Sequence, residues 1–220
     1  MKNNYLIAIE GIPYSGKTTL SHLIKQNMNF KRIPEIAEIN NNGADFPLFP
    51  KNDLEAIQSD SWFFQEEIKR TQIIKEFIKT NSIIMDRSYV SSLAFVKSRF
   101  DCYNIGSIEE HSKLINAGLS NGSLIIPYHI FLDIDMDTYI KRKKSCENYR
   151  LKKFGNIAML NTSNNINNDE FIEHLINFYK NYFLNSETLI LNDNNKSNIL
   201  YGKTKKWIQT LWINLWKKVL

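Results

Sequence analysis

The feature that most constrains the fold of this chain is a glycine-rich segment near the N-terminus. Gly11-Ile-Pro-Tyr-Ser-Gly-Lys-Thr18 matches the pattern G-x-x-x-x-G-K-[ST] at every fixed position. It follows residues 5–10, a short apolar run without helical periodicity that is typical of a buried strand. It precedes residues 17–28, where one face of a helix would carry Leu20, Leu23, Ile24 and Met28. A loop of this kind between a strand and a helix predicts a phosphate-binding site.

The residue types in this loop indicate ATP bound with Mg²⁺. Successive backbone N–H groups turn toward the phosphates, and the positive end of the helix adds to their field. Lys17 would reach the β and γ phosphates, and the hydroxyl of Thr18 would ligate Mg²⁺. The residues that we expect to hold ATP are Gly11, Tyr14, Ser15, Gly16, Lys17, Thr18 and Thr19.

Strand and helix patterns alternate along almost all of the 220 residues. The runs expected as strands are residues 5–10, 31–37, 82–86, 128–133 and 188–191. The segments expected as helices are residues 17–28, 53–80, 89–99, 107–121, 137–146, 169–185 and 203–220. This alternation predicts an α/β fold, in which helices flank a parallel five-stranded sheet, as a single domain over residues 1–220.

One expected helix, residues 53–80, has several apolar positions that we expect to be buried. A break near Ser59-Asp60-Ser61 stays open. The expected buried positions are Leu54, Ile57, Trp62, Ile68, Ile73, Phe77 and Ile78.

The net charge of +5, from 28 Lys+Arg against 23 Asp+Glu, has a local origin. Residues 141–153 hold seven lysines or arginines against Glu147 alone, so the remainder of the chain is close to neutral. A basic excess confined to one segment favours a small anionic ligand over a nucleic-acid surface. We therefore expect no nucleic-acid partner and a basic lid at about residues 141–156.

Cysteine spacing and the N-terminus indicate the compartment. Cys102 and Cys146 lie far apart and lack the paired spacing of a zinc site, so we expect free thiols in a reducing compartment. The first apolar run is too short for a signal peptide or a membrane span, which favours the cytoplasm. Residues 203–220 are expected to pack on the sheet, and a membrane-surface or homodimer role for them stays open.

Three motifs in order along the chain resemble the thymidylate kinase and deoxynucleoside kinase superfamily. They are Ile9-Glu-Gly11, Asp86-Arg-Ser-Tyr-Val-Ser-Ser-Leu-Ala-Phe95 and Phe131-Leu-Asp-Ile-Asp135. The resemblance covers most of the chain from residue 5 to about residue 191. It implies a P-loop kinase that transfers a phosphoryl group from ATP to a nucleoside or a nucleotide.

The resemblance leaves two acceptors open. Asp86, Arg87, Ser91, Ala94 and Phe95 agree with thymidylate kinases, which convert dTMP and ATP to dTDP and ADP. Ser88 fits deoxynucleoside kinases better, and Pro34-Glu35 resembles their Pro-Glu-Pro, in which the Glu is the base. Our leading hypothesis is a thymidylate-kinase-like enzyme, the alternative is a deoxynucleoside kinase, and the third is a nucleotide-binding regulator without transfer.

The resemblance and the charges also assign roles to single residues. Thr18 and Asp86 would hold Mg²⁺, and Gln65 or Arg70 would read the substrate, depending on the family. Glu35 is needed as a base only if the acceptor is a hydroxyl group. The expected catalytic residues are Lys17, Asp86, Arg87, Glu35 and, from the basic lid, Arg142 and Arg150. The expected substrate contacts are Glu35, Phe64, Gln65, Arg70 and Arg87.

Overall fold

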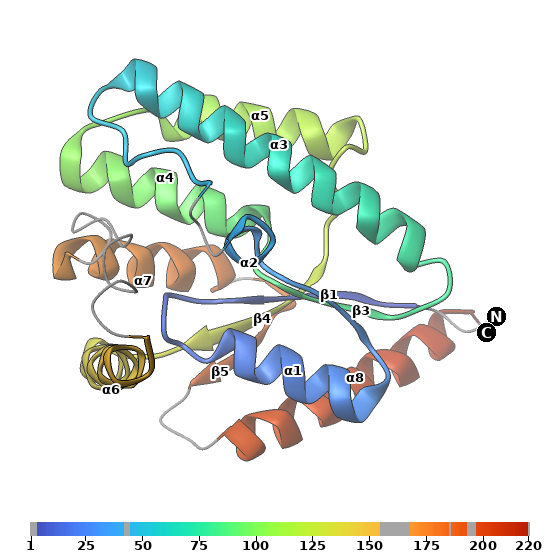
Figure 1. The fold of residues 1–220 in the computed structure, drawn as a ribbon. Helices are drawn as coiled ribbons and strands as arrows, with labels where there is room; N and C mark the ends of the chain where they lie inside the picture. The colour runs from blue at the N-terminus through green and yellow to red at the C-terminus, as the bar shows by residue number, and fades with distance from the viewer. Residues whose placement is uncertain (1–3, 42–44, 155–167, 185, 193–196, 220) are drawn as a thin grey trace.

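The computed structural model of the chain describes residues 4–41, 45–154, 168–184, 186–192 and 197–219. At its centre lies a five-stranded sheet in the order β2-β3-β1-β4-β5 (Figure 1). All four strand pairings are parallel. The strands are β1 (Leu6–Glu10), β2 (Lys31–Ile33), β3 (Ile83–Asp86), β4 (Tyr128–Asp133) and β5 (Leu189–Asn192).

Helices cover both faces of this sheet. Figure 1 shows α1 and α8 on one face and α3, α4, α5 and α7 on the other. Because neither face meets water, every residue of β1 is buried and the strand is apolar almost throughout. The α/β fold expected from the sequence is confirmed. The helices are α1 (Lys17–Met28), α2 (Ile36–Ile39), α3 (Asp53–Phe77), α4 (Tyr89–Tyr103), α5 (Ile108–Ser120), α6 (Met136–Phe154), α7 (Asp169–Phe183) and α8 (Ser197–Val219).

The core lies on both sides of the central strands and fixes the edge at which they end. On one face, Ile7 and Ile9 pack with Leu20 and Ile24 of α1. On the other face, Phe131 of β4 belongs to a cluster with residues of α4 and α7. In the parallel register Ile9 lies beside Asp86, so the loop after β1 and the end of β3 meet at one edge.

Several element boundaries differ from expectation; for example, α4 continues to Tyr103, beyond the expected residue 99. The strand β2 ends at Ile33 because Pro34 has no N–H to donate and Glu35 already caps α2. The helix α8 begins at Ser197, earlier than expected. The helix α6 continues to Phe154, so most of the expected lid is helical. Residues 155–156 of that lid lie outside the described residues, and its function stays a prediction.

The expected buried face of α3 is only partly correct: Ile68, Phe77 and Ile78 pack against the core and Trp62 is partly buried, but the other three positions are exposed. The helix has no break, and Leu54, Ile57 and Ile73 are 67%, 59% and 40% exposed. Its inward face instead carries Asp60 and Arg70, among other polar residues. Asp60 pairs with Arg99 and Arg70 pairs with Glu67, and hydrophobic periodicity does not reveal such pairs.

Within the described ranges, none of the helices combines the length and the apolar character that a membrane span needs.

Candidate active site

The phosphate-binding loop leaves the carboxyl end of β1 and enters α1. Gly11 and Gly16 have φ values of +143° and +99°, which side chains rarely allow. A Cβ on Gly11 would lie 2.8 Å from the carbonyl oxygen of Leu132, so only glycine fits there. Gly16 is the N-cap of α1, so the first N–H groups of that helix face the loop. This geometry suits phosphate binding.

Lys17 folds back into this loop. Its buried Nζ donates hydrogen bonds to the carbonyl oxygen of Ile12 (2.8 Å) and to Oγ of Ser15 (3.3 Å). Burial, followed by the nearby Arg87 guanidinium, lowers the pKa of the Lys17 ammonium to about 7. A phosphate anion in the loop would therefore restore the full charge of this side chain.

Thr18 and Asp86 meet at the edge where β1 and β3 end. Oγ1 of Thr18 donates a 2.6 Å hydrogen bond to Oδ2 of Asp86. Asp86 is fully buried, and its Oδ1 has no hydrogen-bond partner among the described residues. A hydroxyl beside a buried carboxylate with an unpartnered oxygen suits Mg²⁺, which prefers oxygen ligands. These residues therefore fit the ion that the sequence predicts.

Arg87 links the loop to two other parts of the site. Its φ of +63° is unusual for a residue other than glycine, and such backbone strain often occurs at functional sites. Nε of Arg87 donates to Oε2 of Glu35 at 2.9 Å. Nη1 donates to the carbonyl oxygen of Gly11 and to Oγ of Ser91, both at 3.1 Å. Hence the structure brings Arg87 and Glu35 together beside the loop; their catalytic roles stay predictions.

Glu35 is held as a carboxylate in this position. It is the N-cap residue of α2, so the backbone sets its place after β2. Burial alone would raise the pKa of the Glu35 carboxyl, but the charges of Arg87 and Lys17 outweigh burial, and the net pKa is lowered. Glu35 is therefore ionised at neutral pH and able to accept a proton in a reaction.

Glu10 is a site residue to which the sequence analysis gave no role. It is fully buried and accepts hydrogen bonds from N (2.7 Å) and Oγ (2.6 Å) of Ser88 and from Oγ of Ser91 (2.6 Å). The same Ser91 Oγ lies 2.8 Å from the hydroxyl of Tyr179 on α7. Glu10 thus fixes the start of α4 against the central strand. The sequence did contain one sign of this role, because Glu10 is a charged residue at the end of an otherwise apolar strand.

Arg32 is a second residue that the sequence analysis missed. It donates a two-pronged hydrogen bond to Glu38 at 2.9 and 2.6 Å and lies 3.6 Å from Oδ2 of Asp86. Its Nε also donates to Oγ of Ser21 at 2.9 Å. Only the pairing of β2 with β3 places Arg32 beside Asp86. The sequence feature that could have indicated this position is that Arg32 is a basic residue within a short strand.

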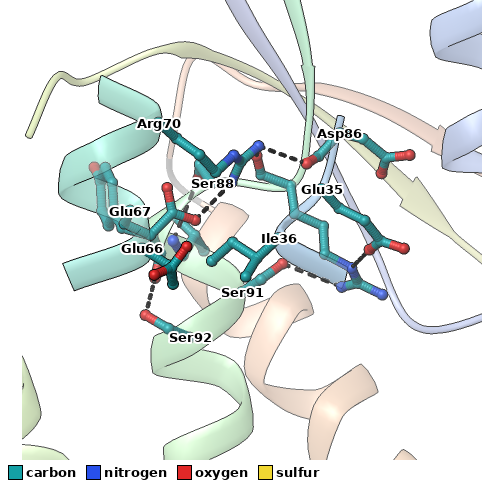
Figure 2. Close-up of polar contacts among 12 residues, drawn as sticks. Glu35, Ile36, Glu66, Glu67, Arg70, Asp86, Ser88, Ser91 and Ser92 are labelled. Carbon is teal, nitrogen blue, oxygen red and sulfur yellow. Dashed lines mark hydrogen bonds and ion pairs between the residues drawn. The ribbon is translucent and has the colours of Figure 1, made fainter. Parts of the chain in front are cut away.

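Arg70 supports the site from behind. It reaches from α3 toward Asp86, as Figure 2 shows, and donates to the carbonyl oxygens of Asp86 (2.9 Å) and Arg87 (3.2 Å). Its Nη1 pairs with Glu67 at 2.7 Å, and the side chain is buried. Arg70 therefore holds the backbone at the end of β3. A direct substrate contact by Arg70 stays a prediction.

The structure does not bring Gln65 and Phe64 to the phosphate-binding loop. Gln65 is exposed on α3, because it lies one position outside the inward stripe of that helix. Phe64 packs against Gly118 of α5. The buried neighbour of Gln65 is Glu66, whose Oε2 accepts from Nδ2 of Asn40 at 3.2 Å.

From the predicted lid, Arg142 reaches the loop. Its Nη1 donates to the carbonyl oxygen of Ser15 at 2.9 Å, so α6 contacts the phosphate-binding loop. Tyr14 of the loop packs on Tyr139 of α6, with ring centroids 5.8 Å apart. The side chain of Arg150 lies outside the described residues. Thr19, which we expected to contact ATP, is exposed on α1.

The comparisons with known proteins agree on one group of enzymes. A family model described as deoxynucleoside kinase matches residues 7–200. One curated relative is a probable thymidylate kinase of Methanocaldococcus jannaschii, which is 26% identical over 70% of this chain and 77% of its own length. Another is probable thymidylate kinase 1 of Saccharolobus solfataricus, which is 27% identical over 64% of this chain and 70% of its own length.

Solved structures show a similar fold. A deoxyadenosine kinase from M. mycoides, with dCMP and a flexible dCDP bound, has a TM-score of 0.65 at 18% identity, covering 93% of this chain and 98% of its own. A thymidylate kinase from Candida albicans has a TM-score of 0.61 at 18% identity, and the match covers 94% of this chain and 92% of that kinase.

Proposed function

Because the chain belongs to the deoxynucleoside kinase family and is a nucleoside or nucleotide kinase, we propose that it transfers the γ-phosphoryl group of ATP to the 5′-hydroxyl of a deoxynucleoside. The observation that carries this proposal is the Glu35 carboxylate beside Arg87 and the phosphate-binding loop. A hydroxyl acceptor must lose a proton during the reaction, and a carboxylate in this place can take it.

The charges around Asp86 also favour a neutral acceptor. Three arginines lie there, and each pairs with its own glutamate: Arg32 with Glu38, Arg70 with Glu67 and Arg87 with Glu35. A monophosphate would bring about two further negative charges and would need cations that are free to bind it. A nucleoside brings no charge, so these ion pairs can remain intact when it binds.

The proposed reaction assigns one task to each side chain. Glu35 accepts the proton of the 5′-hydroxyl group while the oxygen of that hydroxyl group bonds to the γ-phosphorus. The bond between the γ-phosphorus and the bridging oxygen of ADP breaks, and ADP leaves with its electrons. Arg87 orients Glu35, and Lys17 neutralises charge on the β and γ phosphates. Thr18 and Asp86 would hold Mg²⁺, which, when bound, draws charge from the phosphate oxygens.

A substrate panel tests this proposal. ADP release with Mg·ATP would be measured against the four deoxynucleosides and, separately, their monophosphates. We expect release with at least one deoxynucleoside. Release with monophosphates alone would contradict the proposal.

The Glu35→Gln variant tests the proposed base. We expect kcat to fall by about 10²- to 10⁴-fold, with KM for the nucleoside changed much less. Glu38→Gln is the matched control, because Glu38 lies on the same short helix and also pairs with an arginine. A Glu35→Gln variant with the kcat of the wild type would remove the base from the mechanism.

The second candidate is the thymidylate kinase reaction, our leading hypothesis from the sequence. The observation that favours it is that both curated relatives carry the name probable thymidylate kinase. The acceptor oxygen of dTMP is already ionised and needs no base. This candidate therefore predicts ADP release with dTMP, and Glu35→Gln would then keep most of its kcat.

A further inference from the structure

A second cluster of metal-binding residue types lies between α4 and α7, outside the proposed active site. It consists of Cys102 near the C-terminal end of α4 and of Glu170 and His174 near the N-terminal end of α7. One potential ligand atom of each residue lies within 4.8 Å of those of the other two. Neither the proposed kinase reaction nor the phosphate-binding loop uses any of these three residues.

The packing of the two helices fixes this arrangement. Glu170 and His174 are four residues apart, so they lie on one face of α7. Between them Phe171 packs on Phe95 and Tyr103 of α4, with centroids 5.8 and 6.5 Å apart. Because these aromatic contacts hold α7 against α4, the face with Glu170 and His174 meets Cys102.

We propose that Cys102, Glu170 and His174 bind one Zn²⁺ ion and leave its fourth position to water. Thiolate, imidazole and carboxylate are the ligands that Zn²⁺ takes in proteins, at about 2.0–2.3 Å. Those bond lengths place tetrahedral ligand atoms about 3.5 Å apart. Small side-chain rotations would therefore close the cluster around the ion, whereas Mg²⁺ would find a sulfur and a nitrogen where it prefers oxygen.

The charges around the cluster favour a divalent cation. The thiolate of Cys102 and the carboxylate of Glu170 would together neutralise Zn²⁺. Asp101 adds a carboxylate 3.5 Å from Nδ1 of His174, where it can orient the imidazole, and Lys97 pairs with Asp101.

An ion can reach this cluster from solvent. His174 and Asp101 line an open hollow on the surface together with Lys97, Asn177 and Tyr182. Cys102 and His174 are half-buried, while Glu170 is exposed. A site with an entry path and partly covered ligands can load after the chain has folded.

Binding would join the two helices at one end of their contact. Further along the same pair, Ser91 of α4 contacts Tyr179 of α7 beside Arg87. The ion would therefore stiffen a helix pair that also supports the proposed active site. At a Zn²⁺ concentration one hundred times the Kd, we expect Tm to rise by about 5–10 °C.

The test is a titration of the full chain with Co²⁺ as a spectroscopic probe and with Zn²⁺ as competitor. We expect one Co²⁺ per chain, a thiolate-to-cobalt charge-transfer band in the near ultraviolet, and loss of the band when Zn²⁺ is added. Excess Mg²⁺ should not displace the cobalt. No band in the wild-type chain, or displacement by Mg²⁺, would overturn the proposal.

Matched variants locate the site. Cys102→Ser should abolish the band, and Glu170→Gln or His174→Ala should weaken Co²⁺ binding by at least about tenfold. The controls change the same residue types elsewhere in the chain: Cys146→Ser, Glu173→Gln and His22→Ala. They should leave the charge-transfer band and the affinity for Co²⁺ unchanged. Persistence of the band in Cys102→Ser, or its loss in Cys146→Ser, would also refute the assignment.

Discussion

At the scale of single residues, Lys17 shows how a buried charge can serve ligand binding. Its ammonium has a pKa of about 7 in the ligand-free loop, mainly because it is buried. Phosphate oxygens would stabilise the charged form and return the pKa toward its ordinary value of about 10.4. At a pH between these two pKa values, Lys17 takes up a proton when ATP binds, so the affinity for ATP should fall as the pH rises above about 7.

We predict that the Kd for Mg·ATP rises by up to about tenfold per pH unit above pH 7. Calorimetry in buffers of different ionisation enthalpy should show close to one proton taken up at about pH 8.5 and little at about pH 6. Lys17→Arg should abolish the uptake because arginine stays charged. Lys25→Ala, an exposed lysine on the same helix, should behave as wild type. An equal uptake in Lys17→Arg would assign the proton to another group.

The sequence identified those site residues whose motif fixes both the residue type and its position in the fold. Lys17 and Thr18 follow from the loop pattern, and Asp86 from its position at the end of an apolar strand. Arg32 could not be found in this way, because its neighbour Asp86 is 54 positions away and only strand order joins them. Gln65 is exposed because it lies one helical position, about 100°, away from the buried Glu66, and its contact with a substrate stays a prediction.

At the scale of elements, α3 illustrates a helix that packs through buried charges as well as through apolar side chains such as Ala56 and Ile74. Asp60 of α3 and Arg99 of α4 form a two-pronged ion pair at 2.8 and 2.7 Å, and both side chains are nearly buried. Nε of Arg99 also donates to the carbonyl oxygen of Ile105 at 3.1 Å. The pair therefore ties α3, α4 and the turn before α5 together, and no spacing rule in the sequence predicts it.

We predict that Arg99→Met lowers the free energy of unfolding by about 3–5 kcal/mol, because Asp60 would keep an unpaired buried charge. Urea unfolding measures this change. Combining Arg99→Met with Asp60→Leu should recover much of the loss, since no lone charge then remains. Lys113→Met, which breaks an exposed pair with Glu110, should leave the midpoint unchanged. A double variant as unstable as the sum of the two single variants would contradict this explanation.

At the scale of the whole molecule, the strand order decides which residues meet. The alternation of apolar runs and helices predicts a parallel sheet, but it does not state that β1 lies between β3 and β4. That order joins the loop after β1, Arg87 after β3 and Glu35 after β2 at one edge. It also leaves α6, which follows β4, close enough for Arg142 to contact Ser15, a residue 127 positions earlier in the chain.

The contact of Arg142 with the loop leads to the last prediction. Its guanidinium donates to the carbonyl oxygen of Ser15 at 2.9 Å, two residues before Lys17, the first residue of the helix that would bind the phosphates. We predict that Arg142→Ala lowers kcat by about 100-fold or more, because charge that develops on the transferred group loses a cation. KM for ATP should change far less, since the loop and Lys17 bind the ground state. Steady-state kinetics with Lys144→Ala, an exposed lysine on the same helix, as control separates this effect from loss of general positive charge. A rise in KM at constant kcat would assign Arg142 to ATP binding alone.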